Sequence, residues 1–160
     1  IALLPAGLRA RVHVLLAGKP PTARHRARIE ELRLVDQVHF AGWLRDVRPV
    51  IAASDAGFVL SWDVETISFA CREMMAMGKP VLLTDYAGLP ENIEAGREGW
   101  LVPVRDPAAI ANVLREILAQ REMPRAMGAA ARARATAEFG SERFADETID
   151  FYRQVLGEST

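Results

Sequence analysis

Residues 61–81 read SWDVETISFACREMMAMGKPV, and the order of a loop, a helix and a strand within them decides the fold. Ser68 or Thr66 can cap the helix, whose first turn then carries free backbone N–H groups and a partial positive charge. Phosphate groups bind readily at such a helix start. Glu65 is expected in the loop and Glu73 about one and a half turns into the helix, so both carboxylates can face one ligand.

Short apolar runs alternate with helical patterns along the rest of the chain. The expected strands span residues 12–17, 37–40, 56–60, 81–84 and 99–102, and the expected helices span residues 22–34, 46–53, 68–77, 90–95, 106–120, 122–138 and 141–156. Thr22 and Ser141 are the expected N-caps of two helices, and Pro90 and Gly96 are expected to open and end another. Such alternation is typical of a parallel sheet with helices on both faces. We therefore predict an α/β fold: residues 1–160 form one three-layer, doubly wound, Rossmann-like domain, with the last two helices as a helical C-terminal tail that packs against it.

Composition narrows the class of protein. A chain of 160 residues with 50% hydrophobic content suits one domain with a substantial core. The formal net charge of −1 and the lack of a basic block argue against a nucleic-acid partner. The single cysteine, Cys71, cannot form an internal disulfide and is expected to be a buried small hydrophobe in a reducing compartment. No apolar run approaches the ~18 residues of a membrane span and no signal peptide is recognisable, so we expect a cytoplasmic protein.

The loops that follow the expected strands hold most of the unusual residues. In open α/β sheets the ligand lies outside the carboxyl ends of the strands, so these loops should share one crevice. Glycines there allow close backbone approach, a tryptophan offers a stacking face, and carboxylates accept hydrogen bonds from sugar hydroxyls. This combination suits a nucleotide that carries a sugar. The candidate residues are Gly18 and Lys19, Gly42 and Trp43, Glu65, Ile67, Ser68 and Glu73, and Tyr86, Gly88, Pro90 and Glu91.

Other interpretations of these residues stay open. The two glutamates can be a surface carboxylate and a helix-start carboxylate, Trp43 can cover the core, and Lys19 can be a solvated loop residue. The sequence Gly-Lys-Pro at residues 18–20 lacks the other elements of a P-loop. The three histidines, His13, His25 and His39, lack a metal-binding spacing and are expected to be structural. A dinucleotide oxidoreductase is disfavoured because no strand is followed by Gly-x-Gly-x-x-Gly.

Taken in order, the motifs over about ninety residues resemble the retaining GT-B glycosyltransferases of glycosyltransferase group 4 (family 4). The spacing of Glu65 and Glu73 is similar to the two-glutamate motif of that family. The segments that continue the resemblance are residues 38–43, 74–81, 86–93, Gly96, Gly99 and residues 101–103. The resemblance implies the C-terminal, donor-binding domain of a GT-B fold.

The resemblance also implies roles for single residues. Glu73 would bind the ribose hydroxyls, and Glu65, the candidate catalytic residue, would contact the transferred sugar. The backbone of Ile67, Ser68 and Phe69 would meet the distal phosphate, while Gly18 would allow the diphosphate to approach and Lys19 could reach a phosphate. Trp43, beside Gly42, would border the base. Tyr86, Ala87 and Gly88 would face the sugar, and Ala87 stands where the family commonly has glycine, so its Cβ makes the approach less close. Enzymes of this type transfer with retention and need neither a metal nor a cofactor besides the nucleoside-diphosphate sugar.

The family's second domain opens with a strand that carries Gly-Arg, followed by a Lys. Residues 1–5 here read as the end of the helix after that strand. We therefore expect a fragment of a longer two-domain enzyme, in which an N-terminal domain binds the acceptor, a saccharide, a lipid or another molecule. A UDP- or GDP-sugar is the expected donor, polysaccharide biosynthesis is the expected setting, and peripheral membrane association of the full-length protein is left open. The alternatives are a non-catalytic nucleotide-sugar-binding domain and a GT-B sugar-nucleotide epimerase; a phosphorylase is disfavoured because neither Lys19 nor Lys79 lies in a pyridoxal-phosphate motif.

Overall fold

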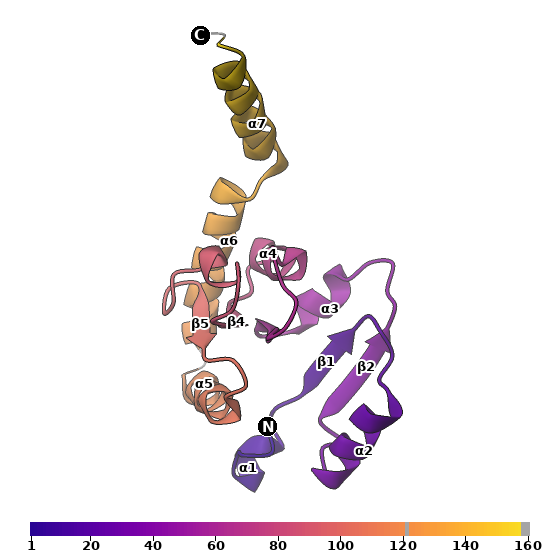
Figure 1. Ribbon diagram of the computed structural model, residues 1–160. Helices are drawn as coiled ribbons and strands as arrows, with labels where there is room; N and C mark the ends of the chain where they lie inside the picture. The colour runs from indigo at the N-terminus through magenta and orange to yellow at the C-terminus, as the bar shows by residue number, and fades with distance from the viewer. Residues whose placement is uncertain (121, 158–160) are drawn as a thin grey trace.

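A computed structural model describes residues 1–120 and 122–157 of the chain (Figure 1), and residue 121 and residues 158–160 of the expected domain lie outside the described part. The described chain is α/β, every strand pair in it is parallel, and the expected C-terminal helix is present. The elements are α1 (Ala6–Arg9), β1 (Val14–Ala17), α2 (Ala23–Glu31), β2 (Val38–Gly42), α3 (Arg48–Ala53), β3 (Gly57–Val59), α4 (Phe69–Ala76), β4 (Val81–Thr84), the 3-10 helix η1 (Pro90–Asn92), β5 (Gly99–Val102), α5 (Pro107–Ala119), α6 (Met123–Glu138) and α7 (Ser141–Leu156).

The strands form two sheets rather than the single sheet expected from the sequence. One sheet pairs β1 with β2, and the other has the order β3-β4-β5. In the first, Val14 lies opposite Val38, and the register shifts between Leu16 and Ala17. β1 and β3 each pair with only one described neighbour, so each presents an unpaired edge. The described chain supplies no strand that joins these two edges.

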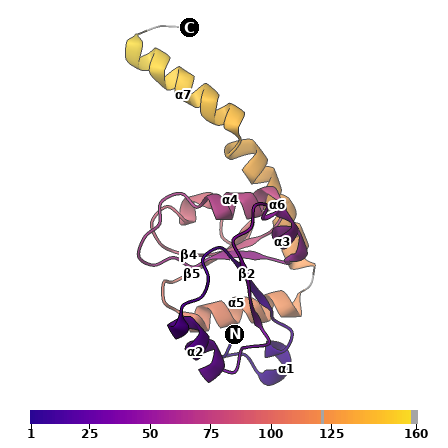
Figure 2. The same ribbon diagram turned by 90° about the vertical axis from the view of Figure 1, so that its right-hand side faces the viewer.

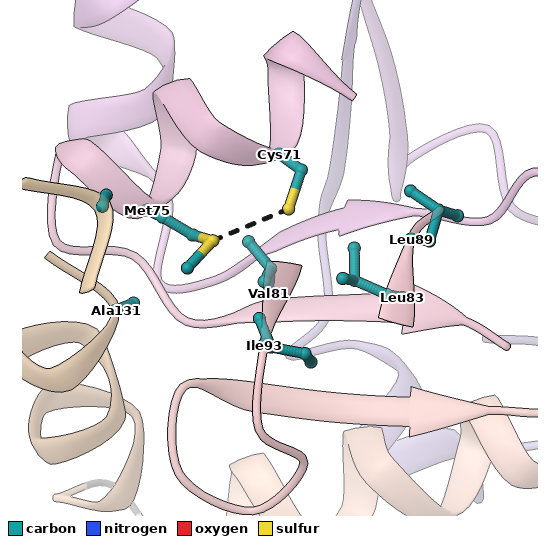
Figure 3. Packing of buried hydrophobic residues seen from close by; sticks show 8 residues of the cluster. Cys71, Met75, Val81, Leu83, Leu89, Ile93 and Ala131 are labelled. Atoms are coloured by element: carbon teal, nitrogen blue, oxygen red, sulfur yellow. Dashed lines mark hydrogen bonds between the residues drawn. The ribbon is translucent and has the colours of Figure 1, made fainter. Parts of the chain in front are cut away.

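The larger sheet is covered on both faces, as a doubly wound architecture requires. All four residues of β4 are buried, which fits a parallel strand packed on two sides. On one face Cys71 and Met75 of α4 and Ala131 of α6 pack against Val81 and Leu83 (Figure 3). On the other face Leu82, Trp100 and Val102 pack with Val113 of α5 and with Met127. Figure 2 shows α4 and α5 on opposite sides of the strands.

Side-chain caps explain the starts of α2, α4 and α5. The Oγ1 of Thr22 accepts the N–H of His25 at 3.3 Å, and the N–H of Thr22 donates to the ring of His25 at 3.4 Å, which forms a capping box at α2. The Asp106 carboxylate accepts the N–H groups of Ala108 and Ala109, both at 2.9 Å, at the start of α5. The predicted cap Thr22 is therefore confirmed, and of the two caps expected for α4 it is Ser68, not Thr66, that accepts a backbone N–H, that of Cys71 at 3.2 Å.

Several expected element boundaries are wrong; the helix expected over residues 22–34, for example, ends at Glu31. Residues 1–5 do not end a helix, because the first helix starts only at Ala6, after Pro5 at its N-cap; a proline disfavours helical geometry in the residue before it. The helix expected over residues 90–95 ends at Asn92, and Ile93 is extended with φ of −139°. Gly140, not Ser141, is the N-cap of α7.

The last helix departs from the expectation that it packs against the domain. α6 does lie along the sheet, but α7 extends away from it (Figures 1 and 2). Its apolar residues Phe144, Tyr152 and Val155 are 73%, 61% and 65% exposed. An amphipathic pattern shows that a helix has an apolar face but does not say what covers it. In the described part of the chain no helix is both long and apolar enough to cross a lipid bilayer.

Candidate functional site

Two loops at the carboxyl edge of the larger sheet form one unit. The Thr84 hydroxyl at the end of β4 donates to the carbonyl of Ser61 at 2.6 Å. Tyr86 donates from its phenol to the carbonyl of Asp63 at 2.5 Å. Gly88 lies so close to the Thr66 carbonyl that a Cβ at residue 88 would overlap it. The segments 61–66 and 84–88 therefore hold each other in place across the ends of β3 and β4.

The loops after β1 and β2 are joined in a similar way on the smaller sheet. The N–H of Gly18 donates to the carbonyl of Gly42 at 2.7 Å. Both glycines have positive φ angles, 120° and 67°, which other residues rarely adopt. Trp43 is 76% exposed, so it does not cover the core, and its stacking face is open to solvent. Lys19 is also exposed.

The start of α4 lies between the two glutamates of the predicted site. Ser68 is its N-cap, and its Oγ accepts the N–H of Cys71 at 3.2 Å. The earlier N–H groups of the first turn, those of Phe69 and Ala70, have no acceptor within a helix. Ile67 and Phe69 are 53% and 74% exposed, so this helix start is accessible from solvent. Such a terminus favours an anion.

The two glutamates stand in different surroundings. Glu65 is partly buried, and its carboxylate accepts the Ser61 hydroxyl at 3.0 Å and the N–H of Thr66 at 3.1 Å. Glu73 is exposed on α4 and has neither of these restraints. Glu65 is therefore held in one orientation, whereas Glu73 can turn toward a ligand.

A cavity of about 240 Å³ lies between the two sheets. Its walls come from β1, β3, α3 and α4, and Glu73 is the one residue of the predicted site that lines it within the described chain. Lys79 also borders it, but its ammonium donates to the carbonyls of Ala52 at 2.9 Å and Ser54 at 2.6 Å. Lys79 thus satisfies carbonyl groups at the end of α3.

Other reactive residues have structural surroundings. Burial raises the pKa of the Cys71 thiol to about 12, so this cysteine is not a nucleophile near neutral pH. The rings of His13 and His39 stack, with Nδ1 of the first 3.1 Å from Nε2 of the second, and His25 belongs to the cap of α2. Across residues 1–120 and 122–157 no three His, Cys, Asp or Glu residues gather as a metal site would require.

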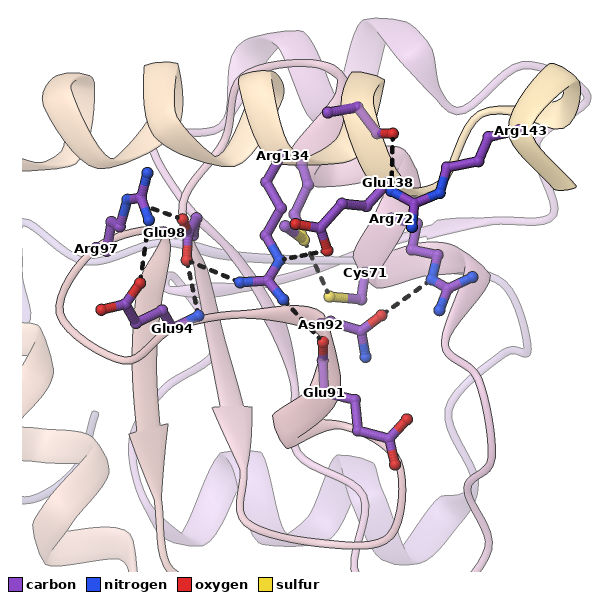
Figure 4. A network of polar contacts seen from close by, with 12 residues as sticks. Cys71, Arg72, Glu91, Asn92, Glu94, Arg97, Glu98, Arg134, Glu138 and Arg143 are labelled. Atoms are coloured by element: carbon purple, nitrogen blue, oxygen red, sulfur yellow. Dashed lines mark hydrogen bonds and ion pairs between the residues drawn. The ribbon is translucent and has the colours of Figure 1, made fainter. Parts of the chain in front are cut away.

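Two residues behind the site were not singled out in the sequence. Asn92 is 1% exposed, and its side chain accepts a hydrogen bond from Nε of Arg72 at 3.0 Å (Figure 4). The same side chain donates to the carbonyls of Gly88 and Leu89, both at 3.1 Å. The only signal in the sequence is a polar residue next to the apolar Ile93.

Comparison with known proteins identifies relatives of one enzyme class. Residues 2–120 match the family model described as "Glycosyl transferases group 1". N-acetyl-alpha-D-glucosaminyl L-malate synthase of Bacillus anthracis is 32% identical over 128 residues, which cover 80% of this chain and 33% of that protein. D-inositol 3-phosphate glycosyltransferase of Streptomyces scabiei is 35% identical over 122 residues, covering 76% of this chain and 25% of that protein. The chain thus spans between a quarter and a third of the length of these two relatives.

A solved structure shares the fold. Anabaena HepE in complex with UDP superposes with a TM-score of 0.86 at 22% sequence identity, covering 96% of this chain and 43% of that one. At this identity the likeness concerns the fold alone. It extends over nearly the whole chain.

Proposed function

The chain belongs to the glycosyl transferases group 1 family, and from this premise we propose that it binds the nucleoside-diphosphate sugar of a retaining glycosyltransferase. The observation that carries the proposal is the start of α4, an accessible helix terminus at the carboxyl edge of β3 with Glu65 before it and Glu73 within it. A helix terminus suits a phosphate, and carboxylates suit hydroxyl groups. A sugar nucleotide presents both. UDP and GDP are the two nucleotides we propose.

Each part of the donor has a proposed partner. Glu73 binds the ribose, and the N–H groups at residues 67–69 bind the distal phosphate. Glu65, already oriented by Ser61 and Thr66, binds the transferred sugar. The remaining proposed contacts are Gly18 and Lys19 with the diphosphate, Gly42 and Trp43 with the base, and Tyr86, Ala87 and Gly88 with the sugar.

The proposed reaction needs little covalent chemistry from the protein. The bond from the anomeric carbon to the diphosphate breaks, and an acceptor oxygen bonds that carbon on the same face, so the configuration is retained. The acceptor proton passes to the departing phosphate oxygen. Helix dipole and backbone N–H groups at α4 would stabilise the negative charge of the leaving group, which is why we propose transfer without a metal.

We also propose that this chain is the donor half of a longer enzyme whose other domain holds the acceptor. The two unpaired edges support this proposal, because β1 and β3 border one cavity and every described strand pair within each sheet is parallel. Neighbouring strands lie ~4.8 Å apart, so one strand from outside this chain could pair with both edges and merge the two sheets. The family resemblance implies such a strand, with Gly-Arg at its end. A full-length protein whose melting temperature is no higher than that of the 160-residue chain would contradict this view.

Titration calorimetry with UDP and with GDP tests the donor proposal, both on this chain and on the full-length protein. We expect one of the two nucleotides to bind. If neither UDP nor GDP binds at millimolar concentration, to this chain and to the full-length protein alike, the donor proposal is refuted. Binding by the full-length protein without sugar transfer to any acceptor would instead favour a non-catalytic nucleotide-sugar-binding domain.

A further inference from the structure

We propose that Arg72 and Asn92 form a brace that positions the sugar-binding loop, residues 86–88, against helix α4 and thereby determines discrimination between a sugar nucleotide and the bare nucleotide. The inference rests on the proposed function, because it concerns the same donor site. Neither residue belongs to the predicted donor contacts.

Asn92 is the centre of the brace. Its side chain is buried, and both of its polar atoms are used: Nδ2 donates to the carbonyls of Gly88 and Leu89, and Oδ1 accepts from Arg72. A buried amide satisfied on both sides has one favourable orientation, since any other leaves polar atoms unpaired. The amide of Asn92 therefore fixes the backbone at Gly88, the last residue of the loop.

Arg72 connects this loop to α4. Its guanidinium lies 4.1 Å from the ring centroid of Phe139, so both its charge and its plane are restrained. Arg72 directly precedes Glu73, the proposed ribose ligand, on the same helix. The contact from Arg72 to Asn92 is thus a short link between the helix that carries Glu73 and the loop that faces the sugar.

The link continues to the other glutamate. Gly88 packs against the Thr66 carbonyl without room for a Cβ, and the N–H of Thr66 donates to the carboxylate of Glu65. A contiguous path of contacts therefore runs from Arg72 through Asn92 and Gly88 to Glu65. Shifts at Asn92 should move the sugar end of the site while the helix start at Ser68 keeps its own cap.

A second anchor holds η1 independently of the brace. Arg134 of α6 donates to the carbonyl of Glu91 at 3.3 Å and lies 3.7 Å from the carboxylate of Glu98 and 3.2 Å from that of Glu138 (Figure 4). These contacts remain when Asn92 is replaced. Loss of the brace should therefore loosen the loop over residues 86–89 rather than unfold the domain.

The test uses Asn92→Asp and Arg72→Lys in the full-length protein. Aspartate keeps the size and the acceptor oxygen of Asn92 but replaces the two donors with an oxygen that faces two carbonyls. Lysine keeps the charge of Arg72 but cannot reproduce its planar geometry. The probes are UDP, UDP-glucose, GDP and GDP-mannose, and Val113→Ala, in the core on the far face of the sheet, is the destabilised control.

We expect Asn92→Asp to weaken binding of the sugar nucleotide about tenfold and that of the matching bare nucleotide less than about threefold, at temperatures where all variants are folded. Arg72→Lys should also weaken binding of the sugar nucleotide more than binding of the bare nucleotide. Val113→Ala should leave the ratio of these two affinities unchanged. Amide hydrogen exchange at residues 86–89 should be faster in both brace variants without any ligand.

The outcomes separate the two proposals. If the wild-type protein binds a nucleotide but neither brace variant alters the affinity ratio, the brace does not position the sugar loop. If the wild-type protein binds none of the four probes, the proposed function fails, and the brace then fails with it as a device of donor recognition. If exchange at residues 86–89 matches that of the wild type, the structural basis of the brace is refuted whether or not a nucleotide binds.

Discussion

Replacing Glu98 with alanine should destabilise this domain, because Glu98 is a buried charged residue with three polar partners. The side chain is 2% exposed, yet it is a carboxylate that accepts the N–H of Glu94 at 2.7 Å. Its oxygens also lie 3.4 Å from Nε of Arg97 and 3.7 Å from Nη1 of Arg134. The substitution Glu98→Ala removes the carboxylate that all three partners share, and it leaves the N–H of Glu94 unpaired.

The size of the loss in folding free energy depends on whether each partner of Glu98 can be solvated or pair with another group. Breaking a fully buried ion pair costs about 3–5 kcal/mol, and a hydrogen bond to a charged group contributes about 1.5–3 kcal/mol. The side chain of Arg97 is 67% exposed and can be solvated, and Arg134, 24% exposed, keeps its pair with Glu138. The lower ends of these two energy ranges therefore apply, and we expect the free energy of unfolding to fall by about 2–3 kcal/mol.

Urea unfolding followed by circular dichroism measures this loss. For a domain of this size it corresponds to a melting temperature lower by about 5–10 °C. Glu98→Gln keeps an acceptor for the N–H of Glu94 and should lose about half as much. Glu122→Gln is the matched control, because its pair with Arg125 is exposed on both sides and contributes less than about 1 kcal/mol. If Glu98→Ala unfolds at the same urea concentration as Glu122→Gln, the carboxylate of Glu98 does not stabilise the fold through residues 94–98.

Four further predictions concern the site and its surroundings. Glu73→Ala should weaken nucleotide binding about tenfold to a hundredfold in calorimetry, because the ribose loses a charged acceptor, while Glu116→Ala on α5 should not. If Glu73→Ala binds as tightly as the wild type, Glu73 does not bind the ribose. Glu65→Ala should lower turnover of the sugar donor more than affinity for the bare nucleotide, and a parallel loss in both would contradict its sugar role. Ala87→Gly should raise stability by about 0.5–1 kcal/mol in urea unfolding, because residue 87 has a φ of 48° that strains a non-glycine residue, and a lower midpoint would disprove the strain. Burial raises the pKa of Cys71 from 9.0 to about 12, so its contribution to stability is complete below pH 9 and is lost as the pH rises toward 12; iodoacetamide at pH 8 should label it only after unfolding.

Much of the fold is local and could be predicted from the sequence. The apolar run of β4 is buried on both faces, and the caps at Thr22, Ser68 and Asp106 each join residues two or three positions apart. Such contacts depend on neighbouring residues alone, so residue type and spacing are enough to indicate them. The division into two sheets could not be predicted in this way, because strand pairing joins segments far apart in the chain.

In the candidate site, too, the local features could be predicted from the sequence and the contacts between distant residues could not. The loop that bears Glu65 and the helix that bears Glu73 are both evident from one short stretch, and so is the cap at Ser68. In the proposed brace, the contact of Arg72 with Asn92, twenty positions apart, sets the distance between residues 86–88 and α4. A buried asparagine has no periodic signal of its own, since its partners are two backbone carbonyls and a side chain from another element.

The start of α4 is held by local contacts and the loop over residues 86–88 by distant ones, and this difference affects how selectivity for the sugar can change. The proposed phosphate-binding start of α4 depends on Ser68 and on the helix itself, so it should persist while other residues change. The sugar loop depends on Asn92 and on the absence of a Cβ at Gly88, both of which act through the position of the backbone. Substitution behind the loop should therefore alter the proposed fit of the sugar without touching the groups that are proposed to hold the nucleotide. Nucleotide affinity and sugar selectivity should then respond to different residues, the first to those at the surface of α4 and the second to those buried beneath it.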